Sequence, residues 1–201
     1  MWLPSDEGTF RIAMAALLTG AVIVAGYHRI RSQVKGGSFS RKDEPSWIFV
    51  PLRLCGLGMF TVMGLCFARP GWFEWAFMPL PPVVRWIGLA VGVLGVGLVG
   101  WTLHNLGTNL TDTVGTRTDH TLITRGPYRY IRHPFYASTF LLVVSMTLLT
   151  ACWLMIAIGG LALVLLYIRT PIEEAKLIER FGDGYRAYAA RTPRFVPGWK
   201  A

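Results

Sequence analysis

The sequence is poor in charge and poor in cysteine. Only 15% of its 201 residues are charged, whereas 53% are hydrophobic, a balance that is rare in soluble domains of this length. Its three cysteines, Cys55, Cys66 and Cys152, lie in apolar segments without a CxxC motif or a Cys/His pairing. This pattern excludes a disulfide framework and a zinc site, and we expect no metal.

Acidic residues are also scarce, with 11 against 20 lysines and arginines, so the formal net charge is +9. The basic residues flank apolar segments and do not form a basic soluble domain. Membrane topology and anionic lipid therefore account for them, and we expect membrane lipid as a partner and no nucleic acid.

What the sequence has instead is long apolar segments, at residues 10–27, 47–68, 83–106 and 135–168. A helix needs roughly 20 mostly apolar residues to span a bilayer. The last segment is too long for one span, and Thr150–Trp153 near its middle suits a tight turn between two. We therefore predict an all-α polytopic membrane protein with about five transmembrane helices, forming a single membrane domain over residues 1–201.

The ends of the first segment and the placement of charge predict the orientation. No positive region precedes the first apolar segment, so we interpret it as a retained span and not as a signal peptide. Lysine and arginine concentrate in the first and third connections and in the C-terminal tail, whereas the second connection carries only Arg69, with Arg85 at the next helix start. The positive-inside rule then places the N-terminus outside and the C-terminus in the cytoplasm.

The third predicted span contains a glycine pattern, Gly95-Val-Gly97-Leu-Val-Gly100, that matches the dinucleotide-binding fingerprint. That fingerprint needs a strand before it and a helix after it, which a transmembrane span cannot provide. With Gly88 and Gly92, these glycines predict a small-residue face for close helix packing.

Ionisable and aromatic groups gather at one end of the predicted fourth and fifth spans. Arg132 and His133 precede Pro134, where we expect the fourth span to begin, and Arg169 and the pair Glu173-Glu174 follow the fifth. A single arginine here could simply snorkel to the interface, but ionisable groups at membrane depth are costly, so a cluster indicates a functional site.

The segment after the fifth predicted span has its own helical pattern. We expect Pro171 to end the span or to start the next helix. Residues 172–190 then form an amphipathic helix on the cytoplasmic surface, which Gly182 and Gly184 interrupt and which could divide into two short helices.

The second half of the sequence contains four motifs in order: His120-Thr-Leu-Ile-Thr, Gly126-Pro-Tyr128, Arg132-His133-Pro134-Phe-Tyr136 and Arg169…Glu173-Glu174. This ordered set resembles the integral-membrane methyltransferases. These include the isoprenylcysteine carboxyl methyltransferases and the phospholipid N-methyltransferases. The resemblance covers about residues 103–197. It implies a methyltransferase core at 83–201 that binds S-adenosylmethionine on the cytoplasmic side, and a variable part at 1–82 with the first two spans.

The resemblance also implies roles for individual residues. The cofactor contacts it implies are His120, Leu122, Gly126, Tyr128, His133, Tyr136 and Glu174. The catalytic residues it implies are Arg169, Glu173 and Arg132.

The predicted activity is transfer of a methyl group to a lipophilic acceptor at the cytoplasmic membrane face. A prenylated cysteine carboxylate is favoured, because Arg169-Thr170 before the glutamates resembles the carboxyl methyltransferase branch more closely than the others. For such an acceptor, Arg169 could hold the anion without a base. A phospholipid amine or a small thiol is an alternative, and an amine would need Glu173 or His133 as a base. Two further alternatives are an NADPH-dependent membrane reductase of the sterol-reductase type and a non-catalytic membrane scaffold.

Overall fold

The chain folds into a bundle of long helices in the computed structural model, which describes residues 7–35, 46–107 and 121–198. The elements, in chain order, are α1 (Glu7–Lys35), α2 (Ser46–Ala68), the 3₁₀ helix η1 (Pro70–Ala76), α3 (Pro82–Leu106), the 3₁₀ helix η3 (Gly126–Arg129), α4 (Pro134–Thr150), α5 (Trp153–Phe181) and α6 (Asp183–Arg191). Over the described ranges there is no strand, and Phe77 and Cys152 form an isolated bridge. The predicted all-α fold is confirmed.

Five apolar helices correspond to the five predicted spans. Four of them, α1, α2, α3 and α5, are long and apolar enough to cross a membrane, and α4 is a shorter apolar helix. With 17 residues, α4 is about 25 Å long at 1.5 Å per residue. The predicted turn between the last two spans is also present, because Ala151 takes a left-handed conformation with φ 49° between α4 and α5.

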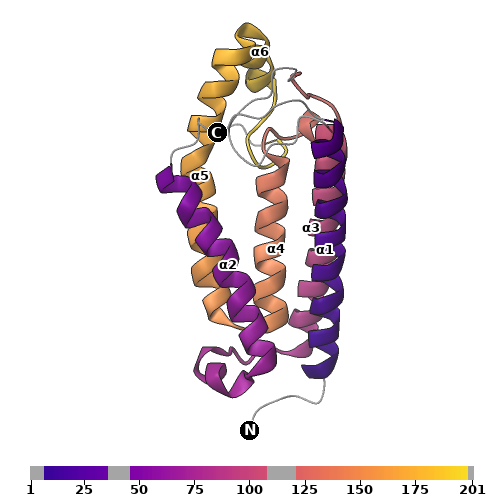
Figure 1. The fold of residues 1–201 in the computed structure, drawn as a ribbon, viewed down its shortest axis with the longest axis vertical. Helices are drawn as coiled ribbons and strands as arrows, with labels where there is room; N and C mark the ends of the chain where they lie inside the picture. Colours follow the sequence, from indigo (N-terminus) through magenta and orange to yellow (C-terminus); the bar gives the residue numbers. More distant parts are fainter. Residues whose placement is uncertain (1–6, 36–45, 108–120, 199–201) are drawn as a thin grey trace.

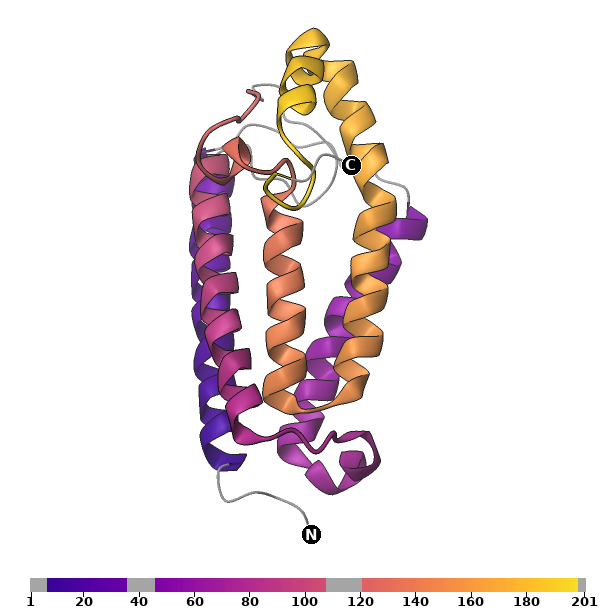
Figure 2. The same ribbon diagram turned by 180° about the vertical axis from the view of Figure 1, so that it is seen from behind.

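The helices are arranged around α4. On one side α4 packs along α3, which α1 covers, and on the other side lie α5 and α2 (Figure 1, Figure 2). Figure 1 also shows that the last part of α5 and all of α6 project beyond the other helices at the end where α4 begins. Residues far apart in the sequence, from η3 to α6, therefore meet at this end of the bundle.

Small residues allow the close packing of α3 on α4. A Cβ atom on Gly88 would lie 2.6 Å from the Cβ of Leu148, and one on Gly95 would lie 3.1 Å from Leu142. A Cβ on Gly92 would collide with Ser145 of α4 and with Leu17 of α1. The predicted small-residue face is confirmed at these three glycines, and it brings the backbones of α3 and α4 together.

The main hydrophobic core lies at the opposite end of the bundle from α6. It contains Phe10, Met14, Met63, Leu149 and Met155, which come from four different helices. Arg85 links three helices at this end, and its charged side chain is buried there. Its guanidinium donates to the Leu149 carbonyl at 2.6 Å, where α4 ends, and pairs with Glu7 at 2.6 Å. Both the charge and an otherwise unpaired helix-end carbonyl are thereby satisfied.

The prediction that α5 ends at Pro171 is wrong. The helix continues through Pro171 to Phe181 and stops only at Gly182, which has φ 54°. Proline removes one backbone N–H, but a helix that packs on its neighbours tolerates that loss. Gly182 ends the helix because its backbone turns left-handed while its N–H still bonds the Ile178 carbonyl at 2.8 Å. The two glutamates consequently belong to α5, and α6 alone forms the separate C-terminal helix.

Candidate active site

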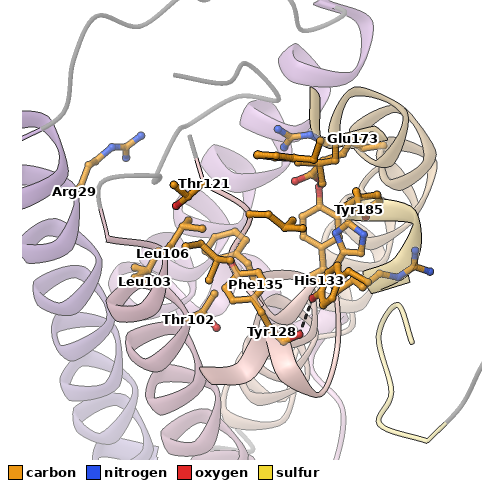
Figure 3. A pocket seen from close by; sticks show the side chains of 18 of the residues that line it. Arg29, Thr102, Leu103, Leu106, Thr121, Tyr128, His133, Phe135, Glu173 and Tyr185 are labelled. Atoms are coloured by element: carbon orange, nitrogen blue, oxygen red, sulfur yellow. Dashed lines mark hydrogen bonds between the residues drawn. The ribbon is translucent and has the colours of Figure 1, made fainter. Parts of the chain in front are cut away.

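A cavity of about 380 Å³ lies at the end of the bundle where α4 begins (Figure 3). One wall is polar and aromatic, and it includes His133, Glu173 and Tyr185. The other wall is apolar and includes Leu103 and Leu106 of α3. The cavity therefore suits a ligand, or a pair of ligands, with one charged part and one lipophilic part.

The polar wall begins at the turn before α4. Gly126 has φ 61°, which favours glycine, and a Cβ there would collide with the side chain of Asn105 at the end of α3. Asn105 is itself held by a 2.8 Å hydrogen bond to the Trp101 carbonyl. His133 occupies the N-cap position of α4 without a capping hydrogen bond from its side chain, and Pro134 is the first helical residue, as predicted. This packing fixes the segment that carries Tyr128, just after Gly126.

Glu174 is held by three partners at once. Its Oε1 lies 3.0 Å from Nη1 of Arg132 and 3.2 Å from Nε2 of His133, and its Oε2 lies 2.9 Å from Nη2 of Arg194. Only 9% of the Glu174 side chain is exposed. A buried carboxylate with two guanidinium partners is compensated for its lost hydration, so this cluster orients Arg132 and His133.

Glu173 lies about a quarter turn away on the same helix and takes a different position. It lines the cavity, and one of its carboxylate oxygens accepts a 2.5 Å hydrogen bond from the Tyr136 hydroxyl. The Tyr136 ring stacks on His133, with 5.2 Å between centroids and 19° between planes. The adjacent glutamates therefore have different roles. Glu174 forms ion pairs with the two arginines, and Glu173 faces the cavity.

Two tyrosines of the cavity outside the membrane spans, Tyr128 and Tyr185, are held as neutral phenols. Burial raises the pKa of Tyr128 well above its ordinary value, and the charge of Glu173 adds to this effect. Burial likewise raises the pKa of Tyr185 to about 12, with Glu174 contributing in the same direction. Tyr188 donates a 2.6 Å hydrogen bond to the Tyr128 carbonyl, which ties α6 to the turn before α4. Neutral rings of this kind can lie against a cation.

The structure brings most of the predicted site residues together. Those that line the cavity are Leu122, Tyr128, Arg132, His133, Tyr136, Arg169 and Glu173. Gly126 supports the turn beneath them, and Glu174 is engaged with Arg132, His133 and Arg194. His120 lies outside the described residues. The individual roles of these residues in binding and catalysis stay predictions.

Sequence reasoning missed several residues at the site, among them Arg194, Phe195, Arg29 and Arg53. Arg194 and Phe195 follow the last helix, and nothing in the local sequence links them to residues 60 positions earlier. Arg29 of α1 and Arg53 of α2 also line the cavity, and in the sequence Arg29 is indistinguishable from the other basic residues beside the spans. A charge located within an apolar helix, as Arg53 is, was the available signal.

The chain is similar to several known proteins. Residues 86–179 match the model of the isoprenylcysteine carboxyl methyltransferase (ICMT) family. A protein-S-isoprenylcysteine O-methyltransferase of Dictyostelium discoideum is 32% identical over 132 residues, which are 63% of this chain and 56% of that protein. The cobalt-zinc-cadmium resistance protein CzcN of Cupriavidus metallidurans is 33% identical over 138 residues, 69% of this chain and 59% of that protein.

The fold has a solved counterpart. The eukaryotic intramembrane Ras methyltransferase ICMT superposes with a TM-score of 0.56 at 22% identity, over 92% of this chain and 67% of that one. This likeness shows a shared arrangement of helices. The chain spans little more than half the length of the two relatives described above.

Proposed function

We propose that this chain is a member of the isoprenylcysteine carboxyl methyltransferase family, whose model residues 86–179 match, and that it transfers a methyl group from S-adenosylmethionine to a lipophilic acceptor. A carboxylate of the isoprenylcysteine type is the acceptor that we favour. The observation that carries the proposal is a cavity in which a wall of ionisable and aromatic groups meets an apolar wall. A charged co-substrate and a lipophilic acceptor can meet there.

The residues of the polar wall fit S-adenosylmethionine. A volume of about 380 Å³ falls within the range of small-molecule sites. The carboxylate of Glu173 can accept from an amino group or from ribose hydroxyls, and Arg132 can donate to a carboxylate. The faces of Tyr128 and Tyr136 suit a cationic centre.

For methyl transfer, the main task of the protein is to position the methyl donor and the acceptor. S-adenosylmethionine supplies a methyl group on a sulfonium sulfur, and the carbon–sulfur bond breaks as the bond to the acceptor forms. Arg169 would hold a carboxylate acceptor in line, and no proton need be removed. The apolar wall would exclude water from the acceptor anion, which strengthens its contacts with Arg169. An amine or thiol acceptor would instead require Glu173 or His133 to take a proton.

We also propose an orientation and a division of the chain. The cavity lies at the end of the bundle that carries the basic connections, so we place it on the cytoplasmic side, with the N-terminus outside. Residues 1–82 would define the acceptor, since α1 and α2 contribute Ala25, Arg29 and Arg53 to the cavity.

Calorimetric titration of the detergent-purified chain with S-adenosylhomocysteine and, separately, with NADPH tests the co-substrate. We expect the first to bind in the micromolar range and the second not to bind. NADPH binding alone would favour the reductase alternative, and binding of neither by folded protein would favour the scaffold. Transfer of a radiolabelled methyl group to an S-farnesylcysteine derivative, phosphatidylethanolamine or a small thiol then distinguishes the acceptor classes.

A further inference from the structure

The segment after α6, residues 192–198, crosses the N-terminal end of α4, and we refer to it as the C-terminal strap. Its backbone pairs with the segment that carries the site. The N–H of Arg132 donates to the Pro193 carbonyl at 2.9 Å, and the N–H of His133 donates to the Arg194 carbonyl at 3.0 Å. These two N–H groups precede α4 and have no partner within that helix. The strap therefore fixes the backbone of both residues.

The strap also supplies a side chain to the buried carboxylate of Glu174. Nη2 of Arg194 lies 2.9 Å from Oε2, and its Nε lies 3.2 Å from Oε2 and 3.3 Å from Oε1. Arg194 is thus the main partner of Oε2, which leaves Oε1 to Arg132 and His133. The pKa of Arg194 is raised by its hydrogen bond to Glu174, so the guanidinium stays charged.

Phe195, the next residue, covers the same group of rings. Its ring centroid lies 5.7 Å from His133, 6.5 Å from Tyr136 and 6.3 Å from Tyr167. The ring covers His133 on the side of the strap and is placed to keep water away from the 3.2 Å hydrogen bond between His133 and Glu174, and such contacts are stronger where water is excluded. Consecutive strap residues, 193 to 195, therefore all contact the segment at the start of α4 or the rings on it.

We propose that the C-terminal strap is a working part of the active site and that Arg194 is its positioning residue. Arg132 and His133 line the cavity, whereas Arg194 does not. Arg194 acts through Glu174: with Oε2 held from the strap side, the other oxygen keeps Arg132 and His133 aimed at the cavity. The inference rests on the proposed function, because its effect is on binding of the co-substrate.

Replacement of Arg194 tests the inference through the affinity for S-adenosylhomocysteine. We expect R194Q to weaken binding about tenfold or more, because hydrogen bonds between charged groups are lost. R194K should have an intermediate affinity, since a single ammonium cannot replace the planar fork of arginine. R186Q is the matched control, because Arg186 pairs with Asp183 on the exposed surface of α6. It should bind within about twofold of wild type.

Chemical rescue separates positioning from a general loss of folding. The Arg194 side chain is 36% exposed, so a small cation can reach its place. In R194A that is shown to be folded by its melting curve, millimolar methylguanidinium should restore binding, whereas methylammonium should restore less. Wild-type affinity in R194Q, or equal weakening in R186Q, would overturn the inference and leave the proposed function intact. Failure of the wild type to bind S-adenosylhomocysteine would overturn both.

Discussion

At the residue scale, the two adjacent glutamates show how one helix serves two purposes. Successive residues on a helix point about 100° apart, so Glu173 and Glu174 cannot face the same partner. Glu174 is buried against Arg132, His133 and Arg194, whereas Glu173 reaches the cavity and accepts a hydrogen bond from Tyr136. One residue holds the site together and the other is available to a ligand.

This difference predicts that two conservative substitutions have different effects on stability. Glu174→Gln leaves two guanidinium groups without their anion, so we expect a loss of stability on the order of 3–5 kcal/mol together with loss of S-adenosylhomocysteine binding. Glu173→Gln keeps an oxygen for the Tyr136 hydroxyl, so the melting temperature should change little while binding weakens. Thermal melts in detergent and calorimetry on both variants make the comparison. Equal melting temperatures for the two variants would contradict the division of roles.

At the element scale, the contact between α3 and α4 places the turn that carries Gly126 and Tyr128. Gly88, Gly92 and Gly95 bring the two backbones close, and the end of α3 then presents Asn105 directly to Gly126. The long α5 contributes from the other side, because it continues past Pro171 and carries both glutamates over the start of α4. The positions of this turn and of the two glutamates therefore depend on helix packing.

A pair of glycines on α3 tests this dependence. Gly92→Ala puts a methyl group against Ser145 and Leu17, and such overpacking costs about 1–3 kcal/mol. Gly97→Ala is the control, because nothing lies within 4 Å of its Cβ position, and better helix propensity should leave it neutral or slightly more stable. Thermal melts with and without S-adenosylhomocysteine measure both effects. A G92A protein as stable as G97A would show that the close contact is unimportant.

At the scale of the whole molecule, the bundle is held together at one end and carries its cavity at the other. The hydrophobic core and the Arg85–Glu7 pair join the helices at the end away from α6. At the cavity end, α1 and α2 lie on opposite sides of α4, and each provides an arginine, Arg29 and Arg53. These cations are where an anionic acceptor entering from the membrane would meet the protein.

Arg53 provides a test of the acceptor side that leaves the co-substrate side untouched. Its guanidinium lies 4.5 Å from the centroid of the Phe49 ring, so the charge is held at the cavity. Arg53→Gln should raise the KM for an anionic lipophilic acceptor about tenfold, the effect of losing one charged hydrogen bond, without changing S-adenosylhomocysteine affinity. Arg69→Gln, at the other end of α2, is the control. An unchanged KM in R53Q would separate Arg53 from acceptor recognition.

Much of this organisation follows from the sequence alone. Local composition predicts the five apolar helices and the turn near Ala151. The conformational preferences of proline and the small size of glycine predict the start of α4 at Pro134 and the glycine face of α3. The gathering of Arg132, His133, Arg169 and the glutamates at one end of the bundle follows as well, because membrane spans of similar length bring their ends to common levels.

Only the tertiary structure decided which groups meet. Whether Pro171 ends α5 depends on packing along the rest of the helix, and the sequence could not show that α5 continues to Phe181. Which glutamate faces the cavity depends on the rotation of α5 about its axis, which hydropathy does not specify. Arg194 reaches Glu174 through a strap without regular structure. Such contacts between distant segments leave no periodic pattern in a sequence, because they are selected by the geometry of the whole bundle.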